Sequence, residues 1–317
     1  MFIEMRNPNN YNTELYNTLK SLPREILHHN DYELREPLGI YSVSISRVFR
    51  AFKNILDKLQ KLNPDLEEID LAHKELLDSI MAFIDDGYLI MKCLYSKSVL
   101  PENIIFADKC LEKVDKLLIK NHKENIFPYR NKVALIANKT KHNHARYCHV
   151  ELSTNLGKVL GYYIEGVDNK GTIIPNKEIH PDYNGVHTAI SYNKDIREQI
   201  ANVYFISHYI SDAIVKIVMK NYNISLNIGK YEYDSNNEII EIFNRVNSLK
   251  TLFFPDEYED LTQIIVKEDC IQIRKPAYKS YVNKLYEYDS SKVRTTISGD
   301  GTTLSWALPY FQKSKSN

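Results

Sequence analysis

The chain has 317 residues, of which 43% are hydrophobic and 26% charged, and these fractions exclude a disordered chain, a collagen or a coiled-coil rod as the overall description. Lysine plus arginine equals aspartate plus glutamate at 41 each, so no global charge would draw the protein onto nucleic acid or anionic lipid. The length suits one large domain or two closely packed ones.

The sequence shows no feature of a secreted or membrane protein. The first ten residues have neither the basic start nor the apolar run of a signal peptide, and no apolar stretch reaches the roughly 20 residues that a membrane span needs. The four cysteines form no CxxC pair and suggest no disulfide framework. We therefore expect a cytoplasmic protein with reduced cysteines and no contact with a membrane.

The first half of the chain has the periodicity of a helical bundle. Residues 1–36 are polar, with one short helix expected near 11–20. Apolar residues then recur at steps of three and four over 45–62 and 68–94, which predicts two core-facing helices. A third helix is expected over about 104–118. Pro128 suits the first turn of a fourth helix that ends near residue 144. Four successive helices with short connections are typical of a bundle.

The apolar period changes to two after residue 145. Alternation over 146–152, a second run over 158–167, and shorter runs at 172–174 and 186–191 predict strands. A long helix over about 194–221 follows. We therefore expect a small antiparallel sheet at about 145–192, inserted between the fourth and fifth helices of the bundle.

The last third of the chain is mixed. A short helix at 237–247 and a hairpin over 263–274 are expected there. The whole chain is thus predicted to be an α+β protein, mainly a bundle of four to five helices. Its expected divisions are a polar segment at 1–36, the bundle with its inserted sheet at 37–221, and a mixed α/β region at 222–317.

Charge is uneven along the chain despite its zero sum. Residues 109–146 contain ten Lys or Arg against three acidic residues, whereas 231–260 contain eight acidic residues against two basic ones. The basic stretch either holds phosphates or is a solvated helix face that the acidic stretch neutralises.

Within the basic stretch, Asn138, Lys141 and His142 fall on one face of the expected helix. A neutral imidazole can take a proton from a ribose hydroxyl or return one to a leaving oxygen, so His142 is the candidate general acid/base. Lys141 and Arg146 would stabilise charge on a phosphate, and Asn138 would orient the histidine. The candidate substrate-binding residues are Arg130, Lys139 and His144. The alternative is a cation-rich helix terminus of the kind that the macrodipole favours.

A helical bundle with an Asn-x-x-Lys-His string at a helix end resembles HEPN-family proteins, many of which belong to prokaryotic toxin and phage-defence systems. The resemblance covers roughly residues 40–221. It implies a metal-independent endoribonuclease that acts on RNA as a homodimer, without a cofactor; a protein partner or an antitoxin is the further partner to expect. Family members carry Arg, a polar residue and then His after four to six positions, but in this chain no histidine follows Arg130 at that spacing. Either residues 138–142 form a variant site, or the chain is a non-catalytic relative that binds a protein partner or RNA.

A metal centre is the weaker interpretation of the same region. The side chains of His142, His144, Cys148 and His149 offer nitrogen and sulfur ligands that zinc prefers. A change from helix to strand would point these side chains in different directions, and no second pair of ligands follows at a familiar spacing. We therefore expect no metal.

Overall fold

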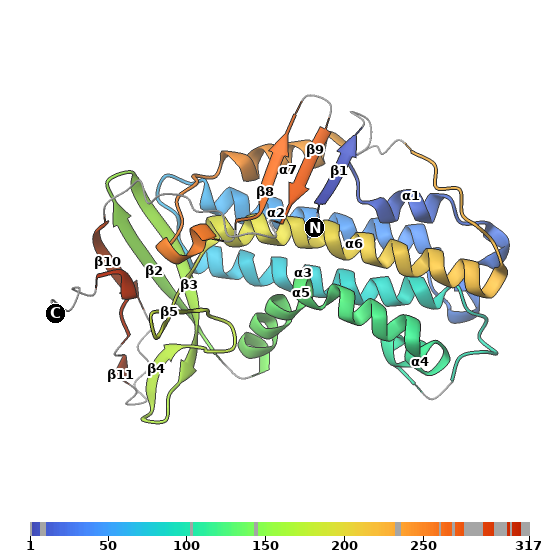
Figure 1. The fold of residues 1–317 in the computed structure, drawn as a ribbon, viewed down its shortest axis with the longest axis horizontal. Coiled ribbons are helices and arrows are strands. Elements are labelled where there is room, and N and C mark those ends of the chain that lie inside the picture. The colour runs from blue at the N-terminus through green and yellow to red at the C-terminus, as the bar shows by residue number, and fades with distance from the viewer. Residues whose placement is uncertain are drawn as a thin grey trace.

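The computed structural model describes residues 2–6, 11–101, 104–142, 145–231, 236–259, 261–267, 270–275, 288–294, 303–304 and 306–311. These residues form a largely helical α+β fold, as the sequence predicts. Figure 1 shows an elongated molecule in which long helices lie side by side and a sheet closes one end.

Four long helices make the bundle, namely α2 (Pro37–Leu59), α3 (Leu66–Lys92), α5 (Lys116–His142) and α6 (Tyr192–Tyr222). Their starts carry recognisable signals. Pro37 begins α2, and the Asp65 carboxylate caps α3 by accepting a hydrogen bond of 2.9 Å from the Glu67 amide. The short helix α1 (Glu14–Lys20) packs against α6, and within the described residues no helix combines the length and apolar character needed to cross a membrane.

The expected start of a helix at Pro128 is wrong, because Pro128 lies inside α5. The break falls instead between α4 (Ala107–Val114) and α5, where Asp115 leaves the helical conformation at φ −134° and ψ 64°. A proline inside a helix removes one backbone hydrogen bond and favours a kink. The residues on either side of Pro128 hold the helix against the core. Ile126 and Tyr129 are buried, and the ring centroids of Tyr129 and Phe205 lie 5.0 Å apart.

The antiparallel sheet expected after the fourth helix is confirmed. Strand β3 (Gly157–Val167) pairs with β2 (Tyr147–Thr154), β4 (Thr172–Pro175) and β7 (Ile190–Ser191), all antiparallel. The C-terminal region extends this sheet with β10 (Tyr288–Arg294), antiparallel to β2, and β11 (Thr303–Leu304), parallel to β4. A separate hairpin joins β5 (Asp182–Tyr183) to β6 (Val186–His187).

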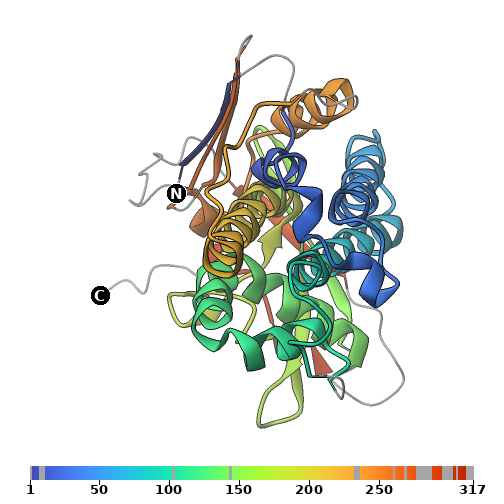
Figure 2. The same ribbon diagram turned by 90° about the vertical axis from the view of Figure 1, so that its right-hand side faces the viewer.

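A second sheet joins the N-terminal strand to the hairpin at residues 263–274. Strand β9 (Cys270–Arg274) pairs with β8 (Gln263–Val266), as the expected hairpin requires, and also with β1 (Phe2–Arg6). Figure 2 shows this sheet on the outside of the bundle, and β8 contacts helix α7 (Asn236–Ser248). These contacts cross the divisions expected at residues 36 and 221, and one hydrophobic core includes residues from all three segments.

Short 3-10 turns complete the described chain, at Arg24–Ile26, His29–Tyr32, Pro255–Glu259 and Pro309–Phe311.

Candidate functional site

The predicted string of polar residues lies where α5 gives way to β2. Asn138 and Lys141 are exposed on the last turns of α5, and His142 is its final residue, of which the structure describes the backbone. His144 lies outside the described residues, and Arg146 is half-buried at the entrance to the sheet. The exposed face carrying Asn138 and Lys141 is therefore open to a ligand.

Two of the predicted cations are held by carboxylates of the sheet region. The Lys139 Nζ lies 2.7 Å from Glu178 Oε2, and Arg146 Nε donates to Glu165 Oε2 at 2.9 Å. The hydrogen bond from Lys139 holds the pKa of Glu178 below its usual value. These two ion pairs fix the end of α5 against the sheet and offset charge that would otherwise attract a phosphate.

Arg130 is not brought to the end of α5. It precedes His142 by three helical turns, or roughly 18 Å along the axis. Its charge acts instead on Asp85 of α3, where burial raises the pKa of the carboxyl and Arg130 partly offsets that effect. Arg130 is thus separated from the other candidate residues.

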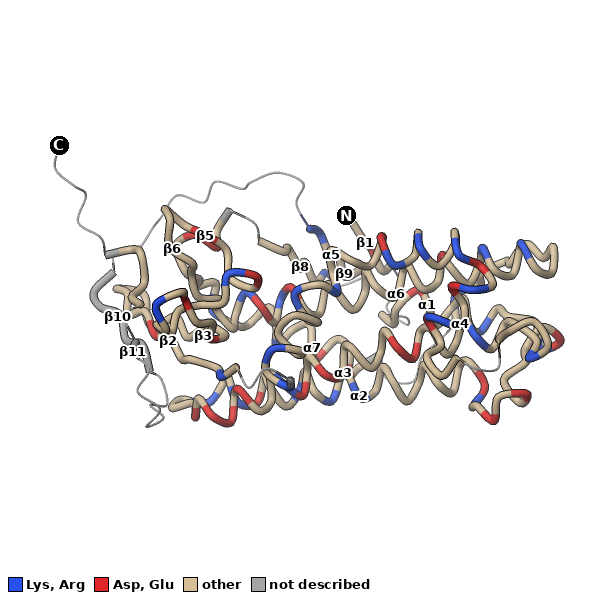
Figure 3. Tube along the Cα trace, turned by 90° about the horizontal axis from the view of Figure 1, so that it is seen from below, with Lys and Arg blue, Asp and Glu red and all other residues tan. Residues whose placement is uncertain are grey.

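In the part of the chain that the structure describes, the basic stretch at 109–146 forms its ion pairs with carboxylates of the helices and the sheet region, and Glu257 of the acidic stretch helps to raise the pKa of Lys132. Its ion pairs in the described part of the chain are Lys109–Glu112, Lys120–Glu124, Lys123 with Asp108 and Glu112, Lys132 with Asp195 and Glu198, Lys139–Glu178 and Arg146–Glu165. Figure 3 shows Lys and Arg positions interspersed with Asp and Glu positions along the bundle. Along the described part of the bundle, the cations are therefore interspersed with carboxylates.

A buried polar network, which the sequence analysis did not identify, joins the bundle to the sheet. His73 of α3 lies with its Nε2 2.7 Å from Asp195 Oδ2 in the first turn of α6, and with its Nδ1 3.0 Å from the hydroxyl of Tyr147. The Tyr162 hydroxyl donates to the same Asp195 oxygen at 2.8 Å. His73, Asp195 and Tyr162 are fully buried.

Lys132 of α5 supplies the charge that balances this network. Its ammonium lies 3.2 Å from Asp195 Oδ1 and 3.3 Å from Glu198 Oε2, and the Gln199 amide donates to Asp195 at 3.0 Å. Burial alone would raise the pKa of Asp195, but Lys132 and the hydrogen bonds from His73 and Tyr162 hold it well below its usual value. Asp195 is therefore a charged carboxylate at the centre of the fold, and both of its oxygens have hydrogen-bond or ion-pair partners.

The network contains residue types that are common in catalytic sites, but a substrate has no access to them. No substrate can reach the imidazole of His73 or the hydroxyl of Tyr162 without opening the core, because both side chains are fully buried. Its contribution is to connect α3, α5 and α6 to β2 and β3. The sequence did contain a signal, since His73 interrupts the apolar stripe formed by Ile69, Leu76 and Ile80.

Asp70, beside this network, gives the fold a pH dependence. Burial raises the pKa of its carboxyl to about 7, although a 2.7 Å hydrogen bond from the Tyr192 hydroxyl acts in the other direction. The His149 Nε2 lies 3.3 Å from the other carboxylate oxygen. The folded protein therefore keeps this proton up to near neutral pH, whereas the unfolded chain releases it near pH 4.

We expect the free energy of unfolding of the wild type to fall as pH rises through this window, because the unfolded state binds fewer protons there. Asp70→Asn keeps an acceptor for Tyr192 and should remove about 2 kcal/mol of that fall between pH 5 and pH 7. Burial also raises the pKa of Glu257 to about 7. Its contribution to the pH dependence of the unfolding free energy is the same in the wild type and in Asp70→Asn. Urea denaturation at a series of pH values measures the unfolding free energy of each protein. If that free energy had the same dependence on pH in both proteins, the prediction would be contradicted.

Among the described residues, no group of three or more His, Cys, Asp or Glu side chains is arranged to hold a metal ion. Cys148 is buried, and His149 faces Asp70.

Comparison of the chain with models of known protein families, with curated proteins and with solved structures found no match in any of the three.

Proposed function

We propose that this chain is a metal-independent endoribonuclease that binds RNA at the end of α5, where His142 is the general acid/base. The observation that supports the proposal most is the placement of Lys141. This side chain is exposed, directly precedes His142, and makes no ion pair within the described part of the chain. Its charge is therefore available for a phosphate of the RNA backbone.

The proposed reaction uses the ribose of the substrate as the nucleophile. His142 accepts the proton of the 2′-hydroxyl, and the 2′-oxygen attacks the adjacent phosphorus. A 2′,3′-cyclic phosphate forms, the bond from phosphorus to the 5′-oxygen breaks, and the imidazolium returns its proton to that oxygen. Lys141 stabilises the charge on the non-bridging oxygens, and Asn138 orients the imidazole or the substrate.

Arg146 and Lys139 have supporting parts in this proposal. The guanidinium of Arg146 is paired with Glu165, and the ammonium of Lys139 is paired with Glu178. Each carboxylate competes with a phosphate for its cation, so both cations would bind a phosphate more weakly than an unpaired one. Both ion pairs hold the end of α5 in place. The proposal therefore assigns Lys141 the largest cationic contribution.

The test is cleavage of a labelled single-stranded RNA in the presence of EDTA. Lys141→Ala should lower the cleavage rate about tenfold or more, since removing one preorganised cation from a transition state typically has that effect or a larger one. Lys170→Ala is the matched control, because Lys170 is an exposed lysine in the turn between β3 and β4. Equal rates for the two variants would remove Lys141 from the site, and absence of cleavage by the wild type would refute the proposal.

A second candidate function, binding a protein partner, is favoured by exposed apolar side chains around α4. Ile105 and Phe106, just before α4, are 91% and 72% exposed, and Leu117, just after it, is 71% exposed. Such patches commonly mark protein contacts. The partner is a second copy of the chain or an antitoxin, and the patch lies at the opposite end of α5 from His142.

If this patch joins two copies, Phe106→Asp should convert a dimer to a monomer in sedimentation velocity while leaving the thermal transition unchanged. A dimer that persists in Phe106→Asp would place the contact elsewhere.

A further inference from the structure

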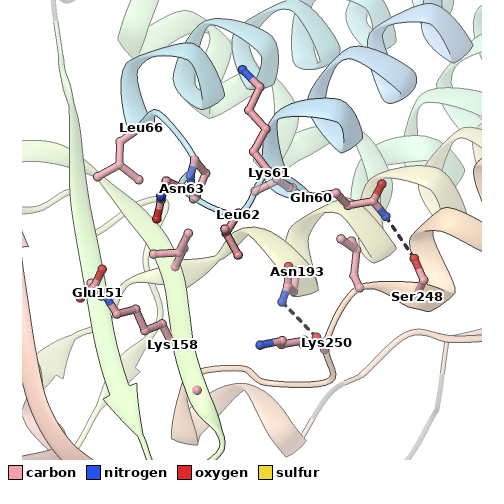
Figure 4. A pocket seen from close by; sticks show the side chains of 15 residues that line it. Gln60, Lys61, Leu62, Asn63, Leu66, Glu151, Lys158, Asn193, Ser248 and Lys250 are labelled. Atoms are coloured by element: carbon pink, nitrogen blue, oxygen red, sulfur yellow. Dashed lines mark hydrogen bonds and ion pairs between the residues drawn. The ribbon is translucent and has the colours of Figure 1, made fainter.

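An open groove lies between the connection from α2 to α3 and the hairpin of β2 and β3. Its volume is about 910 Å³, which is within the range of pockets that bind nucleotide-sized molecules. Residues from four separate parts of the chain line it: 59–66, the β2–β3 hairpin, the first turn of α6, and 248–250. Figure 4 shows the side chains that face it. The hairpin end of β2 that borders the groove lies far from the end next to His142.

The charged side chains of the groove differ in how they are paired. Lys61 lies 2.7 Å from Glu68, and Lys158 lies 3.1 Å from Glu151. Lys250 is exposed and, within the described residues, has no ion pair. One lysine charge in the lining is thus left for an anion from solution.

Lys250 is held in place by residues of α6. The Asn193 amide donates to the Lys250 carbonyl at 3.0 Å, and the buried Arg197 donates to the neighbouring Leu249 carbonyl at 2.9 Å. On the other side, a Cβ added to Gly157 would stand 3.4 Å from the Lys250 ammonium, so the lysine side chain lies against the start of β3. This preorganisation lowers the entropic cost of using Lys250 to bind a ligand.

Apolar side chains also line the groove. Leu62 is 96% exposed, Leu66 lines the groove from the start of α3, and Leu160 lines it from β3. In Figure 4, Leu62 lies between Leu66 and Asn193, and Lys250 lies beyond Asn193. Leu62, Leu66 and Leu160 together offer apolar surface against which the ring of a ligand can pack.

We propose that this groove binds an organic phosphate of nucleotide size. The phosphate lies at the Lys250 ammonium with the Asn193 amide beside it, and the ring of the ligand lies against Leu62 and Leu160. This site goes beyond the proposed RNA cleavage and does not depend on it.

The experiment is isothermal titration of the full chain with ATP in buffer containing EDTA, with adenosine and inorganic pyrophosphate as separate probes. ATP should bind more tightly than either fragment, because only ATP offers both the phosphates and the ring. Lys250→Gln should weaken ATP binding about tenfold, as expected for loss of a charge-assisted contact. Leu62→Ser should weaken ATP binding but leave the weak pyrophosphate binding unchanged.

Lys170→Gln, at an exposed lysine outside the groove, is the matched control and should bind ATP like the wild type. Both lysines are exposed, so unfolding is not expected in either variant, and thermal melting checks this. Failure of wild-type protein to bind ATP at millimolar concentration, or equal affinity in Lys250→Gln and wild type, would overturn the proposal. The Lys141→Ala variant should bind ATP normally, which keeps failure of this site distinct from failure of the RNA site.

Discussion

Asp195→Ala should lower the free energy of unfolding by about 3–5 kcal/mol, since removing one partner of a buried ion pair leaves the other charge uncompensated. The carboxylate accepts hydrogen bonds or ion pairs from His73, Tyr162, Lys132 and Gln199, and all four would lose that acceptor together. Urea denaturation followed by circular dichroism measures the change.

Asp212→Ala is the matched control on the same helix. Asp212 forms an exposed i,i+4 pair with Lys216 at 2.6 Å, and exposed pairs of this kind contribute about 0.5 kcal/mol or less. A loss of similar size in the two variants would show that the network around Asp195 does not anchor the fold.

His142→Ala should reduce the rate of RNA cleavage by about 10²–10⁴-fold, which is the usual contribution of a positioned general acid/base. Single-turnover kinetics with saturating protein separates this loss from weaker binding, and the RNA affinity should change much less than the rate. His208→Ala serves as control, because His208 pairs with Glu14 on the partly exposed face of α6, away from the end of α5. Unchanged single-turnover rates in His142→Ala would take His142 out of the mechanism.

Local periodicity accounts for the parts of the fold that the sequence predicts well. The apolar stripe at 45–62 corresponds to α2, and the alternation after residue 146 corresponds to β2, because in both cases the side-chain period follows from backbone geometry. Pro128 does not begin a helix as its local preference predicts, because the tertiary packing of Ile126 and Tyr129 outweighs that preference. The pairing of β1 with β9 connects residues more than 260 positions apart, and no local pattern encodes it.

The candidate site, like the fold, is only partly predictable from local sequence patterns. Helical spacing does predict that Asn138 and Lys141 emerge together on an exposed face. It cannot predict that Glu165 and Glu178 hold Arg146 and Lys139, since those ion pairs depend on how the sheet folds back onto α5. The contact between His73 and Asp195 spans 122 positions and likewise appears only once the bundle and the sheet are assembled. The chemical roles of His142 and Lys141 stay predictions.

The most direct measurement compares cleavage of one RNA oligonucleotide with cleavage of the same sequence in which every sugar is 2′-deoxy, both in EDTA. Because the proposed nucleophile is the ribose hydroxyl activated by His142, the wild-type protein should cut the RNA and leave cyclic phosphate ends, and it should leave the deoxy strand intact. Cleavage of both strands at similar rates, or of neither, would contradict the account.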